Sequence, residues 1–215
     1  MNSITTTNPD TNNASTTRIR MFGFSPTRAT RPMWTFAELG MDYEAVTENV
    51  FEHPELKNYH PLGRLPVLDV NGRGLFESAA ICTYLADLHP DRNLIQSSGT
   101  WQRALHDQWT SFALSEMDAW AWSTFRSTNI VPAQERVPEM YDYNRNAYRL
   151  SAAALEVALA ENDYLVDNRF SVTDIIVGWT CHFGQKLGYN DGFNNMNAYL
   201  ERLMQRPECA LPSFA

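Results

Sequence analysis

The chain has 215 residues, a formal net charge of -8 at pH 7 and an ordinary globular composition, with 44% hydrophobic and 20% charged residues. Lys and Arg form no cluster, so this acidic chain is not expected to bind nucleic acid. No apolar run approaches the roughly 18 residues that span a bilayer. The N-terminus also lacks the basic start and apolar core of a signal peptide. These features predict a soluble, cytoplasmic protein with no membrane partner.

The cysteines and histidines show no spacing that is typical of a metal site or a redox motif. Cys82, Cys181 and Cys209 lie far apart in the sequence and form no C-x-x-C pair. The histidines include no pair at the H-x-x-x-H spacing. We therefore expect free cysteines in a reducing compartment and no bound metal.

The first part of the chain alternates between strand and helix patterns. Residues 1–17 are rich in Thr, Asn and Ser and predict a disordered tail. An apolar run at 19–24 predicts a buried strand, the pattern at about 30–39 predicts a helix, and residues 42–48 predict a second strand. Because a helix separates the two strands, they are expected to be parallel neighbours in one sheet.

A hairpin is predicted next, after an irregular loop at 51–63. Asn71-Gly72 separates two apolar segments and is the strongest short-range hairpin signal, because both central residues of a type I′ turn need a positive φ. We expect residues 67–70 to pair with the segment that follows the turn, as antiparallel strands.

The pair Glu77-Ser78 opens a helix that is predicted to end near residue 88. Ser78 occupies the expected N-cap, where backbone N–H groups and the positive end of the helix dipole point outward. Such a helix start can bind a carboxylate or a phosphate.

From about residue 94 every long segment has helical periodicity. Trp101, Leu105, Trp109 and Phe112 recur at i, i+4, i+8 and i+11. Further helices are predicted at 139–160, after the capping pair Ser171 and Asp174, and around the apolar set Met196, Tyr199, Leu200 and Leu203. The predicted organisation is an α/β domain at 18–90, a linker at 91–99 and an all-helical domain at 100–215.

At this point the chain resembles the cytosolic glutathione transferase family, in a bacterial-type form. The resemblance rests on the segments HPLGRLPVLDVNGRGLFESAAICTYL, RFSVTDI and YLERLMQRPE. It implies a thioredoxin-like N-terminal domain, an all-helical C-terminal domain, glutathione as co-substrate and usually a homodimer.

The resemblance also implies roles for individual residues. Pro66 would be cis and would turn the backbone of Leu65 toward the cysteinyl part of glutathione. Ser78 would hold the γ-glutamyl carboxylate and Glu77 would pair with the γ-glutamyl amine. Arg64 would lie near the glutathione backbone or its glycine end.

The group that activates the thiol remains open between two hydroxyls. The family places a Tyr, Ser or Cys in the turn after the first strand, and this turn holds neither Tyr nor Cys. The segment from Thr27 to Arg31 resembles the Ser-Arg-x-Ser/Thr-Arg turn of bacterial members, which puts Thr27 in the serine position. Ser25 is the second candidate. A third possibility is that no hydroxyl activates the thiol and that backbone N–H groups or Arg28 alone do so.

Apolar residues of the first helical segments are candidates for a wall at the second substrate, namely Trp109, Phe112, Met117, Trp120 and Trp122. A stripe at helical spacing is also typical of a plain core. Trp120 and Trp122 cannot both face one way on a helix, so one of them at most is expected at the site.

The expected function is therefore a glutathione transferase that adds the thiolate to a small apolar electrophile. Isomerisation, dehalogenation or ether cleavage with glutathione is a second possibility that uses the same first domain. A non-catalytic ligand-binding protein of the same fold is a third. The absence of Cys from the turn disfavours thiol oxidoreduction.

Overall fold

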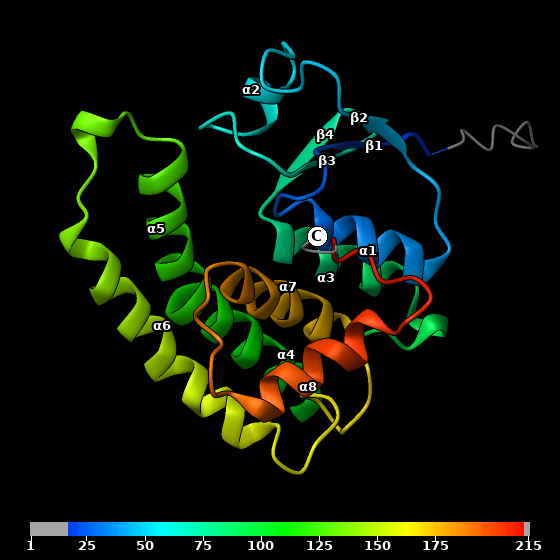
Figure 1. Ribbon diagram of the computed structural model, residues 1–215. Helices are drawn as coiled ribbons and strands as arrows, with labels where there is room; N and C mark the ends of the chain where they lie inside the picture. Colours follow the sequence, from blue (N-terminus) through cyan, green and yellow to red (C-terminus); the bar gives the residue numbers. More distant parts are fainter. Residues whose placement is uncertain (1–16, 213–215) are drawn as a thin grey trace, which may run out of the picture.

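The computed structural model describes residues 17–212, which form a mixed sheet flanked by helices, followed by a helical region (Figure 1). This arrangement confirms the predicted fold class. The predicted tail lies outside the described residues, apart from Thr17. Within residues 17–212 no helix has the length and hydropathy that crossing a bilayer requires. No group of His, Cys, Asp or Glu there is arranged to hold a metal ion.

Within the described residues the sheet has four strands, β1 (Ile19–Phe22), β2 (Glu44–Val46), β3 (Val67–Val70) and β4 (Arg73–Phe76), in the order β2-β1-β3-β4. β1 is parallel to β2 and antiparallel to β3, and β3 pairs with β4 in an antiparallel hairpin. Both the parallel pair and the hairpin were predicted. β1 and β2 are both shorter than their predicted ranges of 19–24 and 42–48.

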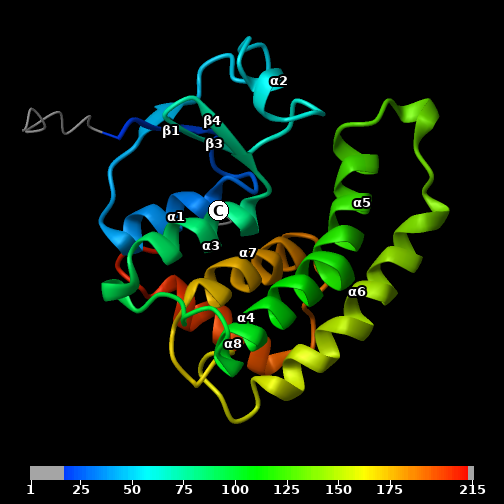
Figure 2. The ribbon, with the colours of Figure 1, turned by 180° about the vertical axis from the view of Figure 1, so that it is seen from behind.

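Helices cover both faces of this sheet. α1 (Thr30–Leu39) and α3 (Ser78–Leu88) lie between the sheet and the helical region, whereas the short α2 (Leu56–Tyr59) lies on the opposite face (Figures 1 and 2). Alternate residues of β1 and β3 therefore enter two separate cores. Met21 and Leu68 join the large core beside α1 and α3, and Phe22 and Val67 join the small core beneath α2.

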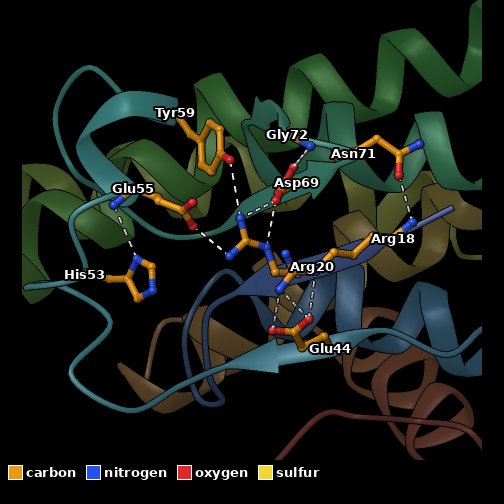
Figure 3. A network of polar contacts seen from close by, with 9 residues as sticks. All are labelled: Arg18, Arg20, Glu44, His53, Glu55, Tyr59, Asp69, Asn71 and Gly72. Atoms are coloured by element: carbon orange, nitrogen blue, oxygen red, sulfur yellow. Dashed lines mark hydrogen bonds and ion pairs between the residues drawn. The ribbon is translucent and has the colours of Figure 1, made fainter.

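A buried ion network fixes α2 to the sheet (Figure 3). Arg20 Nε donates to Asp69 Oδ2 at 2.7 Å, and Arg20 Nη1 lies 2.6 Å from Glu55 Oε2. The second terminal nitrogen of Arg20 donates to the Tyr59 hydroxyl at 3.4 Å. Because Arg20 and Asp69 are both buried, removal of either one would leave the other as an unpaired buried charge, which is strongly destabilising. The network thereby anchors the loop that leads to Leu65.

The helical region consists of α4 (Trp101–Phe112), a π-helical segment (Ala113–Asp118), α5 (Ala119–Asn129), α6 (Glu139–Ala158), α7 (Val172–Lys186) and α8 (Asn194–Met204). α7 is buried along nearly its whole length. The Ser171 N–H donates to the Asp174 carboxylate at 2.8 Å at its start, which confirms the predicted capping box.

One buried histidine joins the sheet domain to the helical region. The His106 ring from α4 lies 3.1 Å from Thr83 Oγ1 on α3 and 2.9 Å from Thr173 Oγ1 on α7. Burial lowers the pKa of His106 to about 4. The ring is therefore neutral in the folded protein at pH values where an unfolded histidine is protonated.

This difference predicts acid-sensitive stability. Between the unfolded pKa of 6.5 and the folded value of about 4 the unfolded chain binds the extra proton, so stability falls as the pH drops through this window. Each pKa unit corresponds to about 1.4 kcal/mol, so protonation of His106 should lower the free energy of unfolding by about 3 kcal/mol. Urea unfolding at several pH values should show a shallower pH dependence for His106→Gln than for the wild type. Equal slopes would contradict this assignment.

Candidate functional site

A cleft of about 510 Å³ opens between the turn after β1, the loop before β3, and helices α5 and α7. Aromatic side chains make up much of its wall, namely Phe24, Phe51, Trp122, Phe125, Trp179 and Phe183. Arg28, Arg64 and Lys186 also line it. Among the described residues the lining includes no Asp or Glu. The cleft therefore suits a molecule that is apolar in part and carries negative charge.

The register of the β3–β4 hairpin assembles the glutathione residues that the resemblance implied. Val67 pairs with Phe76, so Leu65-Pro66 before one strand and Glu77-Ser78 after the other lie at the same open end of the hairpin. The Leu65–Pro66 peptide bond is cis. Leu65 is half-buried and lines the cleft, which connects this hairpin end to the cleft.

Ser78 is buried, whereas its neighbour Glu77 is exposed. The Ser78 hydroxyl is buried and accepts a hydrogen bond from Arg31 Nη1 at 3.0 Å, so its own hydrogen remains for a ligand oxygen. Glu77 is exposed and has a φ of 71°, a region that non-glycine residues seldom occupy. Such conformations cluster at functional sites. Neither residue is part of the cleft lining itself.

The two candidate hydroxyls are in different situations. Thr27 lines the cleft, but its hydroxyl donates to the Phe24 carbonyl at 2.5 Å and accepts from the Ala29 N–H at 3.1 Å. Its hydrogen is thus used within the turn. Ser25 is exposed and accepts a hydrogen bond from the Thr30 hydroxyl at 3.1 Å, but it is not among the residues that line the cleft. Thr27 thus lines the cleft but has no hydrogen left to donate, and Ser25 does not line the cleft.

Of the five residues of the predicted apolar wall, one lines the cleft and four do not. Trp109 and Phe112 contact each other at a centroid distance of 5.8 Å and pack against the large core. Trp120 contacts Tyr143 on α6. Met117 is fully buried in the core. Trp122 does line the cleft, in agreement with the expectation that at most one of the two neighbouring tryptophans would.

Sequence analysis missed two groups of residues at the site. Trp179 and Phe183 on α7 complete the aromatic wall. Their helical spacing places them on one face of a helix but does not distinguish a core from a ligand site. Arg31 and Asp118 form a buried ion pair, with Arg31 Nη2 donating to Asp118 Oδ2 at 2.6 Å. These two residues are far apart in the sequence, and no local pattern links them.

Two family models match the chain. "Glutathione S-transferase, N-terminal domain" matches residues 18–87, and "Glutathione S-transferase, C-terminal domain" matches residues 119–207. Among curated proteins, an elongation factor 1-gamma of Prunus avium is 32% identical over 180 residues. That alignment covers 80% of this chain and 40% of the relative, so the chain spans about two fifths of the length of that protein.

Two further relatives match along most of their length. Protein LigF of Sphingobium sp. is 27% identical over 238 residues, covering 88% of this chain and 90% of LigF. Its crystal structure, described as a beta-etherase, has a TM-score of 0.76 at 23% identity and covers 89% of this chain and 96% of that one. A glutathione transferase of Phanerochaete chrysosporium in complex with oxidized glutathione has a TM-score of 0.78 at 22% identity, with 91% and 94% covered. These two solved structures share the fold.

The role of Thr27 in the turn can be tested through stability. Thr27→Val removes one donated and one accepted hydrogen bond, which should lower the free energy of unfolding by about 1–3 kcal/mol. Thr27→Ser keeps the hydroxyl and is the matched control, with a smaller expected change. Urea denaturation measures both. An unchanged midpoint for Thr27→Val would show that the two bonds do not hold the turn.

Proposed function

The chain belongs to the cytosolic glutathione transferase family, and from this premise we propose that it binds glutathione and adds the glutathione thiolate to a small apolar electrophile. The observation that carries the proposal is the open end of the β3–β4 hairpin. There Leu65-Pro66 and Glu77-Ser78 lie together, beside a cleft with aromatic walls.

Glutathione fits this hairpin end through complementary charges. Its γ-glutamyl group is a zwitterion, and the first turn of α3 offers N–H groups, the dipole and the Ser78 hydroxyl to the carboxylate. Glu77 offers a carboxylate to the amine. The backbone N–H and C=O of Leu65 would pair with the cysteinyl part, and Arg64 would lie near the glutathione backbone or its glycine end.

The cleft then receives the thiol and the second substrate. The thiolate attacks an electrophilic carbon and a C–S bond forms; with an aryl halide the carbon–halogen bond breaks and halide leaves. The aromatic walls exclude water and bind a flat apolar molecule. The basic side chains and the lack of a carboxylate in the lining favour an anionic sulfur over a neutral one.

Homodimer formation is part of the same proposal. Large apolar side chains are exposed on β4, α3 and the start of α4, namely Phe76, Tyr84, Leu88 and Trp101. Exposed apolar surface of this kind is typical of an interaction site. Size-exclusion chromatography with light scattering would measure the mass of the protein in solution. We expect the mass of two chains.

A ligand-binding protein without catalysis is the second candidate. It is favoured by the Thr27 hydroxyl, whose hydrogen is used within the turn. The elongation factor 1-gamma match also shows that the proteins similar in sequence to this chain include one that is not named a transferase. Under this alternative glutathione binds but no electrophile reacts.

Calorimetric titration with glutathione, followed by initial rates on aryl halides, epoxides, enones and an aryl ether, separates the candidates. The aryl ether is included because the LigF structure is described as a beta-etherase. We expect glutathione binding and turnover of at least one apolar electrophile. Binding with no turnover on the whole panel would favour the ligand-binding protein, and absence of binding would contradict both.

Ser78→Ala tests the carboxylate contact. Loss of a hydrogen bond to a charged group costs about 1.5–3 kcal/mol, which corresponds to an increase in the glutathione Kd of at least about tenfold. Ser151→Ala, on α6, removes a hydroxyl of the same size away from the hairpin and serves as the control. Equal dissociation constants for the wild type and Ser78→Ala would exclude Ser78 from the binding site.

A further inference from the structure

A buried cluster of three charged side chains lies beside the cleft. Asp118, the last residue of the π-helical segment, accepts hydrogen bonds from Arg28 Nε at 3.1 Å and from Arg31 Nη2 at 2.6 Å. Arg28 Nη2 is also bonded to the same carboxylate. The Arg31 and Asp118 side chains are 0% and 2% exposed, whereas Arg28 is 26% exposed. The cluster therefore meets solvent mainly through Arg28.

The cluster carries a surplus of positive charge. Burial alone would raise the pKa of Asp118, but Arg31 and Arg28 together lower the pKa, so the carboxylate stays ionised. Two guanidinium groups and one carboxylate sum to one net positive charge, because arginine does not lose its proton in proteins. A buried charge without a counterion is unfavourable. An anion next to Arg28 would relieve this cost.

Arg28 is positioned to meet an anion in the cleft. Its guanidinium lies 4.5 Å from the ring centroid of Trp122 and 5.9 Å from that of Trp179, both of which line the cleft. Asp118 engages Nε and Nη2. Among the described residues none accepts a hydrogen bond from Nη1, which is thus available to a ligand.

We propose that Arg28, held in place by Asp118, stabilises the thiolate of bound glutathione, a role for which the sequence offered two hydroxyls of the same turn first and Arg28 among the remaining alternatives. This inference rests on the proposed glutathione binding. The thiol proton leaves to solvent, and the sulfur anion neutralises the surplus charge of the cluster. Arg28 is then the catalytic residue and Asp118 the positioning residue. The Thr27 hydroxyl, whose hydrogen is used within the turn, and Ser25, which does not line the cleft, leave this role to Arg28.

The direct test is the thiol pKa of glutathione in the binary complex, measured by ultraviolet absorbance of the thiolate against pH. Arg28→Met should raise this pKa by about one unit or more, a tenfold loss of thiolate below the pKa. Arg28→Lys keeps the charge and should recover part of the shift. Arg145→Met removes an equal charge from α6, outside the cleft lining, and is the control, with little expected change. The acidic limb of the pH profile of kcat should move with the thiol pKa.

Asp118→Asn separates positioning from simple charge. The substitution makes the cluster more positive by one unit, so a pure field effect would lower the thiol pKa further. If Asp118 holds Arg28 in the cleft, the released Arg28 stabilises the sulfur less and the thiol pKa rises. Thr180→Val removes a contact of Arg31 but none of Arg28, and should leave the thiol pKa near the wild-type value.

Each outcome has one interpretation. An unchanged thiol pKa in Arg28→Met, with glutathione still bound, overturns the inference and leaves the proposed function intact. A higher KM for the electrophile with an unchanged thiol pKa also overturns it, because Arg28 would then bind the second substrate. No glutathione binding by the wild type would overturn both. Because Arg28 is partly exposed, Arg28→Met decides the case even if Asp118→Asn does not fold.

Discussion

The buried carboxylate of Asp118 links the sheet domain to the helical region. It accepts hydrogen bonds from Arg28 and Arg31 across the boundary between the two regions. Arg31 is fully buried and also bonds to Ser78, to Thr180 and to the Ile176 carbonyl, so its charge is solvated entirely by protein groups. Removing Asp118 would leave two arginines without their shared counterion, an arrangement that buried sites tolerate poorly.

Arg31 contacts both Ser78, the proposed partner of the glutathione carboxylate, and the wall of the cleft. Its Nη1 bonds to Ser78 at the hairpin end, and its guanidinium lies 4.5 Å from the Trp179 ring centroid at the cleft. On the far side of the sheet, Arg20 pairs with Asp69 and also contacts Glu55 and Tyr59, which ties α2 to the sheet. The proposed binding site is thus fixed from two directions by buried ion pairs, which is how a site is kept preorganised.

Local signals in the sequence predicted much of the fold. Asn71-Gly72 gave the hairpin, Ser171 and Asp174 the start of α7, and both patterns depend on residues close in the chain. The cis Leu65–Pro66 bond was expected only because the segment resembled a known family. The cleft wall was predicted less well, because helical periodicity identifies a buried face without showing whether a core or a ligand covers it.

The π-helical segment also limited prediction. An i→i+5 turn changes the direction of the side chains that follow it, so the stripe that starts at Trp101 does not extend into α5 with one phase. In α5, Trp120 contacts Tyr143 and Trp122 lines the cleft. The hydroxyl of Thr27 could not be assigned either, because the sequence does not show whether it bonds to its own backbone. The Arg31–Asp118 pair joins segments that only the tertiary fold brings together.

A crystal structure of the protein with glutathione tests the central claim most directly. The account predicts the γ-glutamyl carboxylate at hydrogen-bond distance from Ser78 Oγ and the α3 N–H groups, the cysteinyl backbone paired with Leu65, and the sulfur facing Arg28 Nη1. A ligand bound elsewhere, or a sulfur directed away from Arg28 toward the Ser25 hydroxyl, would contradict it.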